Sequence, residues 1–329
     1  MSTAAACKSS GPGDSAGGSN DAAFYKGKTL RVIVPYGPGG GYDQWPRVMQ
    51  PYLKKYLGVS NIDIVNAPGG GGLIGTGQIY NASPDGLTIG DTNAGGDVFD
   101  QMDNATGFNM DVTKYQWIGR PDDDPHVLAT RTGSGVDFTK LLKTKSTVKA
   151  LATGKGSSDY NAAVVVYNSF KIPFSMIAAF SGSSDEKASF LSGEGTTASL
   201  SSSDIAAVKG KAEAILVVSA KKFSKLPNVP TVVDVAKAQN LPTKTVSALQ
   251  ALSDVMDLGH AWFAPKGVPA GRITALQSAF QKAMADPKML AAAKKAGLYP
   301  GYESGTQLSS AVNKALAQKS LFTELLKST

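Results

Sequence analysis

Two glycine-rich turns constrain the fold of this chain more than any other feature. The first covers residues 37–43, Gly-Pro-Gly-Gly-Gly-Tyr-Asp, and the second covers residues 68–72, Pro-Gly-Gly-Gly-Gly. A short run rich in β-branched residues precedes each turn, and a segment with helix-like apolar spacing follows it. Strand, glycine turn and helix, repeated in this order, predict an α/β fold with a parallel sheet.

The same turns indicate a ligand site. Glycine lets the backbone approach a ligand closely, and the helix that follows begins with unpaired N–H groups and a partial positive charge. These features suit a carboxylate or a phosphate. A tight turn without a ligand is the simpler explanation for one isolated glycine, but two such runs at strand-to-helix junctions favour a ligand role.

Residues 70–75 also match the dinucleotide-binding pattern G-x-G-x-x-G, and Asp91 follows at about the expected 20 residues. The match is weak, because a run of four glycines satisfies the pattern by chance. Residues 66–68 also separate the strand from the turn, whereas the fingerprint requires the strand to enter it directly. Neither turn ends in the Lys-Ser/Thr of a phosphate-binding loop. We therefore expect no nucleotide and no other cofactor.

The length of 329 residues indicates about two domains. No run of 18 apolar residues occurs, so we predict no membrane-spanning helix. Further strands are predicted at residues 87–90, 126–131, 148–153, 174–179, 214–219 and 261–264, with helices at 42–56, 160–170, 184–191, 272–285 and 306–326 and an irregular stretch around prolines 227, 230 and 242.

The net charge of +7 comes mostly from lysines. Many of them lie among Ala and Leu in the last sixty or so residues, which is typical of solvated helix faces. A nucleic-acid site would require clustered Arg and aromatic residues, and the sequence has no such cluster. We therefore predict no nucleic-acid partner.

Cys7 is the only cysteine, so no intrachain disulfide can form. Residues 4–7, Ala-Ala-Ala-Cys, resemble the end of a bacterial lipoprotein signal, although Ala4 stands where Leu is usual. Residues 8–20 are rich in Ser, Gly, Pro and Asp and have the composition of a flexible tether. The basic and apolar parts of a signal peptide are missing, so we interpret residues 1–3 as an engineered start. We predict that Cys7 carries a lipid anchor.

Residues 31–43 resemble the opening strand and loop of the substrate-binding (Bug) family of tripartite tricarboxylate transporters. Matches to later family landmarks follow in order at residues 66–76, 84–89, 154–158, 226–231 and 262–269. The resemblance runs from about Phe24 to the C-terminus. The chain departs from the family at residues 180–182, where Phe-Ser-Gly replaces the common Tyr-Lys-Gly, and at Tyr160, near a frequent His. Residues 244–259 are also longer than usual.

The resemblance implies a two-lobed, type II periplasmic-binding-protein fold with a ligand cleft between the lobes. Residues 24–123 and 255–329 would form one lobe and residues 124–254 the other, after a tether at 1–23. The implied function is an extracytoplasmic, monomeric solute-binding protein, not an enzyme, that captures a small organic acid for a membrane permease. The predicted ligand-binding residues are Tyr36, Pro38, Gly39, Gly40, Gly41, Tyr42, Asp43, Asn93, Ala94, Ser157, Ser158, Phe180, Ser181, Gly182 and Ser183.

Other residues fit simpler roles. Arg120 either binds a ligand carboxylate or, as we favour, pairs at a hinge with the Asp run at residues 122–124. That run lacks the spacing of a calcium loop. His126 and His260 have no metal-ligand partner at helical spacing, so we predict structural roles for both and no metal site. Trp45 is a further aromatic candidate for stacking on the ligand.

Two alternative functions remain open in the sequence. A ligand-loaded protein of this kind could dock on a membrane sensor instead of a permease. An enzyme is the less favoured alternative, because Ser157 or Ser158 would have only two histidines in the chain to act as a base, and no Gly-x-Ser-x-Gly elbow surrounds either serine.

Overall fold

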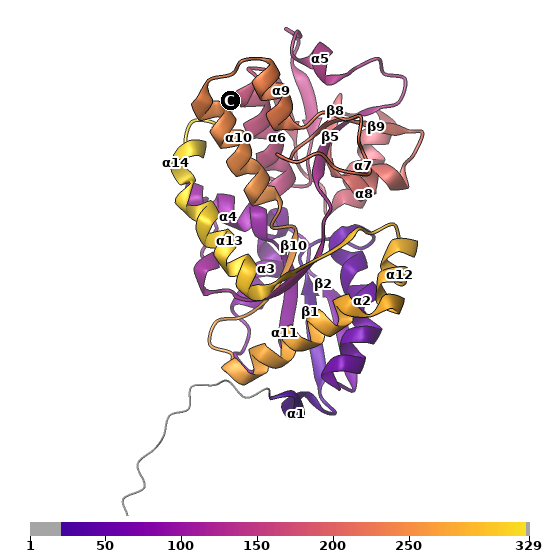
Figure 1. Ribbon diagram of the computed structural model, residues 1–329, viewed down its shortest axis with the longest axis vertical. Coiled ribbons are helices and arrows are strands. Elements are labelled where there is room, and N and C mark those ends of the chain that lie inside the picture. Colours follow the sequence, from indigo (N-terminus) through magenta and orange to yellow (C-terminus); the bar gives the residue numbers. More distant parts are fainter. Residues whose placement is uncertain (1–20, 327–329) are drawn as a thin grey trace, which may run out of the picture.

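The computed structural model describes residues 21–326, which form two β-sheets flanked by helices (Figure 1). One sheet lies in the lower part of Figure 1 and the other in the upper part, so the molecule is two-lobed, as predicted. Cys7 and most of the predicted tether lie outside the described residues. Among the residues described, no helix is long and apolar enough to cross a membrane.

The first sheet has six strands and is mixed. β1 pairs in parallel with both β2 and β3, which confirms the parallel arrangement predicted around the glycine turns. β10 then inserts antiparallel between β3 and β4, and β11 adds antiparallel to β4. The order is β11 (Pro300–Ser304), β4 (Gln116–Asp122), β10 (His260–Ala264), β3 (Thr88–Asn93), β1 (Thr29–Val34) and β2 (Asn61–Asn66).

The second sheet has five strands. Its order is β7 (Phe174–Ile177), β6 (Val148–Leu151), β8 (Thr197–Ser201), β5 (His126–Arg131) and β9 (Ala212–Val217). β6 is parallel to β7 and β8, whereas β5 is antiparallel to β8 and β9. Four of these strands were predicted. β8 was missed because its sequence, Thr-Ala-Ser-Leu-Ser, is mostly small and polar and carries little strand signal.

The predicted helices are confirmed at α2, α3, α6, α7 and α11, whereas α4, α5, α8 and α12 lie where none was predicted. The predicted helix at residues 306–326 is interrupted at Gln318 into α13 and α14, and the stretch expected to be irregular contains α9 and α10. The bounds are α1 Ala22–Tyr25, α2 Gly41–Leu57, α3 Leu73–Tyr80, α4 Ala94–Asp103, α5 Phe138–Leu141, α6 Ser158–Ser169, α7 Ser183–Ser192, α8 Ser202–Ala207, α9 Val232–Ala238, α10 Thr243–Met256, α11 Ala270–Ala285, α12 Pro287–Lys295, α13 Gly305–Ala317 and α14 Lys319–Phe322, with short 3₁₀ turns at Gly70–Gly72 and Val112–Lys114.

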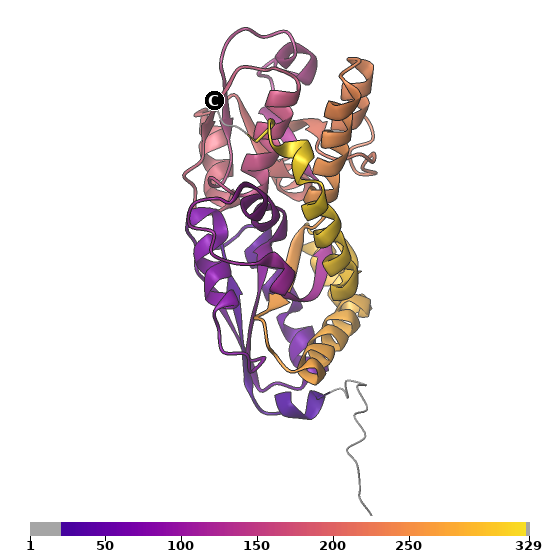
Figure 2. The same cartoon turned by 90° about the vertical axis from the view of Figure 1, so that its left-hand side faces the viewer.

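The C-terminal helices pack across both lobes. From β11, α13 and α14 run upward along the molecule, as both views show (Figures 1 and 2), and both contact α10. One buried cluster joins Val98 of α4, Val165 of α6, Leu252 of α10 and Phe322 of α14. This continuous apolar packing resists a wide separation of the lobes on that side. The exact lobe boundaries stay a prediction.

Candidate ligand-binding site

Strand direction brings polar residues from distant parts of the chain to the junction of the lobes. β1, β3 and β4 all point their carboxyl ends at this junction, so the turn after β1, Asn93 and Asp122 meet there. Because β10 is antiparallel, its first residue, His260, lies at the same edge and pairs with Asn93. In the second sheet the antiparallel β5 places His126 opposite Ser201 in the same way.

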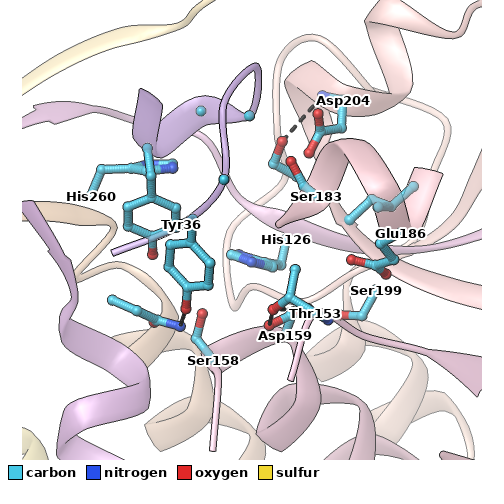
Figure 3. A pocket seen from close by; sticks show the side chains of 17 residues that line it. Tyr36, His126, Thr153, Ser158, Asp159, Ser183, Glu186, Ser199, Asp204 and His260 are labelled. Carbon is cyan, nitrogen blue, oxygen red and sulfur yellow. Dashed lines mark hydrogen bonds between the residues drawn. The ribbon is translucent and has the colours of Figure 1, made fainter. Parts of the chain in front are cut away.

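A cavity lies where these strand ends meet (Figure 3). Its volume is about 40 Å³. Both lobes contribute to its walls. The lining residues are Tyr36, Gly37, Gly40, Gly41, Tyr42, Asn93, His126, Thr153, Ser158, Asp159, Ser183, Glu186, Ser199, Leu200, Ser201, Asp204 and His260.

The first glycine turn is held in place by Asp43 from the first turn of α2. Its carboxylate accepts hydrogen bonds from the Gly39 N–H at 2.9 Å, from Arg47 at 2.7 Å and from Asn66 at 2.9 Å. Burial alone would raise the pKa of Asp43, but these donors outweigh burial and lower it. Gly39 has a φ of +93°, a backbone conformation that other residues rarely adopt. Asp43 therefore shapes the turn and does not itself line the cavity.

Three rings pack in a row along the first-lobe wall, with neighbouring planes tilted by 34° and 54°. The centroids of Tyr36 and Tyr42 are 4.5 Å apart, and those of Tyr42 and His260 are 4.1 Å apart. The Tyr36 hydroxyl donates to the Gly71 carbonyl at 2.7 Å and accepts from the Asn93 side chain at 2.9 Å. Hydrogen bonds therefore orient the Tyr36 end of this row, and the His260 imidazole at the other end lies against the glycine turn.

His260 is a buried cation in this wall. Its Nδ1 lies 2.5 Å from a carboxylate oxygen of Asp122, which is 1% exposed. Burial lowers the pKa of His260, but the charge and hydrogen bond of Asp122, with added charge from Asp91 and Asp124, outweigh burial and raise it to about 9. Nε2 lies 2.8 Å from the place where a Cβ on Gly41 would be. The first-lobe wall thus combines an imidazolium with the N-terminus of α2, an arrangement that attracts anions.

The second-lobe wall is acidic. Asp159 accepts hydrogen bonds from the Thr153 N–H at 2.6 Å and from its hydroxyl at 2.9 Å. Asp204 forms an ion pair with Lys187. Glu186, in the first turn of α7, is fully buried, and neither of its carboxylate oxygens makes a hydrogen bond of ordinary geometry. Figure 3 shows its carboxylate turned toward Thr153, Asp159 and Ser199.

Direct contacts hold the lobes together beside the cavity. The Gly37 N–H donates to the Ser181 carbonyl at 2.8 Å. On the other glycine turn, a Cβ on Gly71 would lie 2.6 Å from the Lys155 carbonyl, so that backbone approaches the second lobe closely. The second glycine turn therefore contacts the opposite lobe but does not line this cavity. The structure is a closed arrangement around a small space.

The structure separates the predicted site residues into two groups. Tyr36, Gly40, Gly41, Tyr42, Asn93, Ser158 and Ser183 line the cavity. The other eight lie near it but outside its lining: Pro38, Gly39, Asp43, Ala94, Ser157, Phe180, Ser181 and Gly182. Ser157 illustrates the second group, because it is the N-cap of α6 and its hydroxyl donates to the Gly154 carbonyl at 2.6 Å.

Several single-residue expectations need correction. Arg120 does not pair with the Asp run; it forms an ion pair with Glu303 at 3.3 Å and donates to the Asp257 carbonyl. The reason is that β11 pairs beside β4 and brings Glu303 opposite Arg120. Trp45 is 1% exposed and belongs to a buried apolar cluster with residues of the first sheet, such as Val32 and Trp262.

The two histidines were expected to be structural, yet both line the cavity. Sequence reasoning also did not find Asp159, Glu186 and Asp204. Each of these five residues stands at the beginning of a strand or in the first turn of a helix. A titratable residue at the start of a strand or helix was therefore the available signal in the sequence. It predicts a site only when the direction of the strands is known, because direction decides which element ends meet.

Comparison with known proteins identifies the family. The family described as "Tripartite tricarboxylate transporter family receptor" matches residues 46–325. The chain belongs to this family. One relative of this tripartite tricarboxylate transporter receptor is the "UPF0065 protein in tcbD-tcbE intergenic region" of Pseudomonas sp. (strain P51), 25% identical over 292 residues that cover 83% of this chain and 79% of that protein.

Solved structures show the same fold. The periplasmic binding protein BugD is 20% identical, with a TM-score of 0.75 over 92% of this receptor chain and 98% of its own. MatC (Rpa3494) from Rhodopseudomonas palustris, solved with bound malate, is 19% identical, with a TM-score of 0.71 over 91% of this chain and 99% of its own. These likenesses confirm the predicted periplasmic-binding-protein fold, and the family match confirms the predicted family.

Proposed function

We propose that this protein captures a small organic acid between its lobes, outside the cytoplasm, and delivers it to the permease of a tripartite tricarboxylate-type transporter. The observation that carries the proposal is the first-lobe wall of the cavity. There the protonated imidazole of His260 lies against the glycine turn at the N-terminus of α2, a helix of 17 residues. A carboxylate placed at this wall would meet both a cation and unpaired backbone N–H groups.

Family membership and a fold neighbour support the same chemistry. MatC holds malate, a dicarboxylate, on a similar fold. In the present closed arrangement the lobes touch beside the cavity, where the Gly37 N–H donates to the Ser181 carbonyl. Binding therefore requires the lobes to separate at the Gly37–Ser181 contact and to close again on the ligand. Such closure would mark the loaded state for a permease.

A thermal-shift screen against aliphatic and aromatic carboxylic acids tests the binding function. A ligand at about 100 times its Kd should raise the free energy of unfolding by roughly 2.7 kcal/mol. We expect at least one stabilising acid that is recovered unchanged after incubation, and a smaller shift in His260→Gln. A stabilising acid that is chemically converted, or no stabilisation by any acid, would contradict the proposal.

Delivery and anchoring have separate tests. We expect cells that lack this gene to lose uptake of the identified acid and to regain it from a plasmid copy. If deletion leaves uptake intact but abolishes a transcriptional response to the acid, the protein serves a sensor. For the anchor, we expect wild-type cells to incorporate labelled palmitate into the protein and Cys7→Ser cells not to do so. Equal labelling of both would rule out Cys7 as the attachment site.

A further inference from the structure

The second-lobe wall of the cavity contains a carboxyl group that the fold leaves unpaired. Glu186 is 0% exposed, and no hydrogen bond of ordinary geometry reaches either of its carboxylate oxygens. Burying an unpaired carboxyl group costs folding free energy, and buried polar groups in proteins are normally hydrogen-bonded. Because Glu186 lines the cavity, a ligand bound there could form the hydrogen bond that this carboxyl group lacks.

The surroundings of Glu186 are short of positive charge. Asp159 on α6 and Asp204 on α8 face it, and Lys187 is already paired with Asp204. Burial, reinforced by the charges of Asp159 and Asp204, raises the pKa of Glu186 well above its usual value, while Lys187 and the Ser199 N–H offset this only in part. Among the residues that the structure describes, Lys187 pairs with Asp204 and none forms an ion pair with Glu186.

Two further groups on this wall have unused hydrogen-bonding capacity. The Nδ1 atom of His126 and the hydroxyl of Ser199 are buried and have no hydrogen-bond partner. Burial is the main influence on His126 and lowers its pKa, so burial disfavours a positive charge on this ring. Among the described residues, no three His, Cys, Asp or Glu side chains are arranged to hold a metal ion. The partner that suits Glu186 is therefore a hydrogen-bond donor carried by an organic ligand.

We propose that Glu186 accepts a hydrogen bond from an ammonium group of the ligand, so that the ligand is an organic acid that also carries an amino group. This inference rests on the proposed function, which places the ligand's carboxylate at His260 and the glycine turn on the opposite wall. The charges of the two walls match such a ligand. The first-lobe wall offers a cation to its carboxylate, and the second-lobe wall offers carboxyl groups to its ammonium group. A second carboxylate at the Glu186 wall would instead meet Asp159 and Asp204 at short range.

Calorimetric titration with matched acids tests the inference. The probes are succinate against aspartate and hexanoate against 6-aminohexanoate, because the members of each pair differ only by an amino group. A hydrogen bond between charged groups corresponds to an affinity difference of roughly tenfold to a hundredfold. We expect the amino member of at least one pair to bind about tenfold or more tightly than its partner, with release of a proton as Glu186 ionises.

Two variants separate this subsite from a structural role. Glu186→Gln keeps the shape but not the charge, and we expect it to abolish both the preference for the amino member and the proton release. Glu213→Gln, at an exposed position on β9 of the same lobe, is the matched control and should bind as the wild type does. Equal binding of both members, or a preference that survives Glu186→Gln, would refute the inference and leave the proposed function intact. If none of the four acids binds and the wider acid screen is also negative, both fail.

Discussion

The buried pair of His260 and Asp122 makes the stability of this protein depend on pH in a predictable way. The pKa of His260 rises from 6.5 to about 9 in the folded protein. Because each pKa unit corresponds to about 1.4 kcal/mol, protonated His260 contributes roughly 3 kcal/mol to stability. A raised histidine pKa means that this contribution is complete below about pH 6.5 and is lost as the pH rises through about 9.

The perturbation that isolates this contribution is the double variant Asp122→Asn with His260→Gln. It removes both charges together and so leaves no unpaired buried charge. Burial also raises the pKa of Asp97 to about 7 and that of Asp100 to about 8. These two carboxyl groups titrate in the same pH range, but they are present in both proteins and cancel in the difference.

Urea unfolding at several pH values measures the effect. We expect the free energy of unfolding of the wild type, minus that of the double variant, to fall by roughly 3 kcal/mol between pH 6 and pH 9.5. The side-chain resonances of the two histidines provide an independent check in protein without a histidine tag, since the double variant identifies the signal of His260. Stability curves that stay parallel with pH, or a His260 midpoint near 6.5, would refute the reasoning.

Three further changes have defined outcomes. In Gly41→Ala the new methyl group would lie 2.8 Å from the His260 imidazole, so we expect a loss of about 1–3 kcal/mol in urea unfolding and weaker acid binding. The control Gly77→Ala, at a helical site with open space around it, should gain about 0.5–1 kcal/mol. Equal effects of the two substitutions on stability would contradict the packing argument. Asp43→Ala removes the acceptor that holds the first glycine turn, and we expect it to cost roughly 2 kcal/mol in chemical denaturation and to weaken binding of any stabilising acid. Because burial raises the pKa of Glu186, the wild type loses stability relative to Glu186→Gln as the pH rises above 4.5, the pKa of this carboxyl group in the unfolded chain. A difference in melting temperature between the two proteins that does not grow with pH would show that Glu186 titrates normally.

Local sequence patterns were sufficient for the elements around the glycine turns. Residues 30–34 have the β-branched content of a buried strand, and the glycine run after them can only be a turn, so β1 and the start of α2 were predicted within a residue or two. Patterns failed where tertiary contacts override propensity. β8 is a strand because it lies between β6 and β5, and α10 forms in a proline-rich region because its apolar face packs on α6.

The site, like the fold, has features that follow from local sequence and features that depend on tertiary contacts. The sequence by itself determined the first glycine turn, with Tyr36, Gly41 and Tyr42, because a turn is made by neighbouring residues and its backbone chemistry can be read locally. Only the tertiary structure decided that His260 meets Asp122, 138 residues away, and that Glu186 lines the same cavity with no hydrogen bond of ordinary geometry. The charge of a histidine and the cost of a buried carboxyl group depend on their surroundings, and strand direction across two lobes assembles those surroundings from segments that are far apart in the chain.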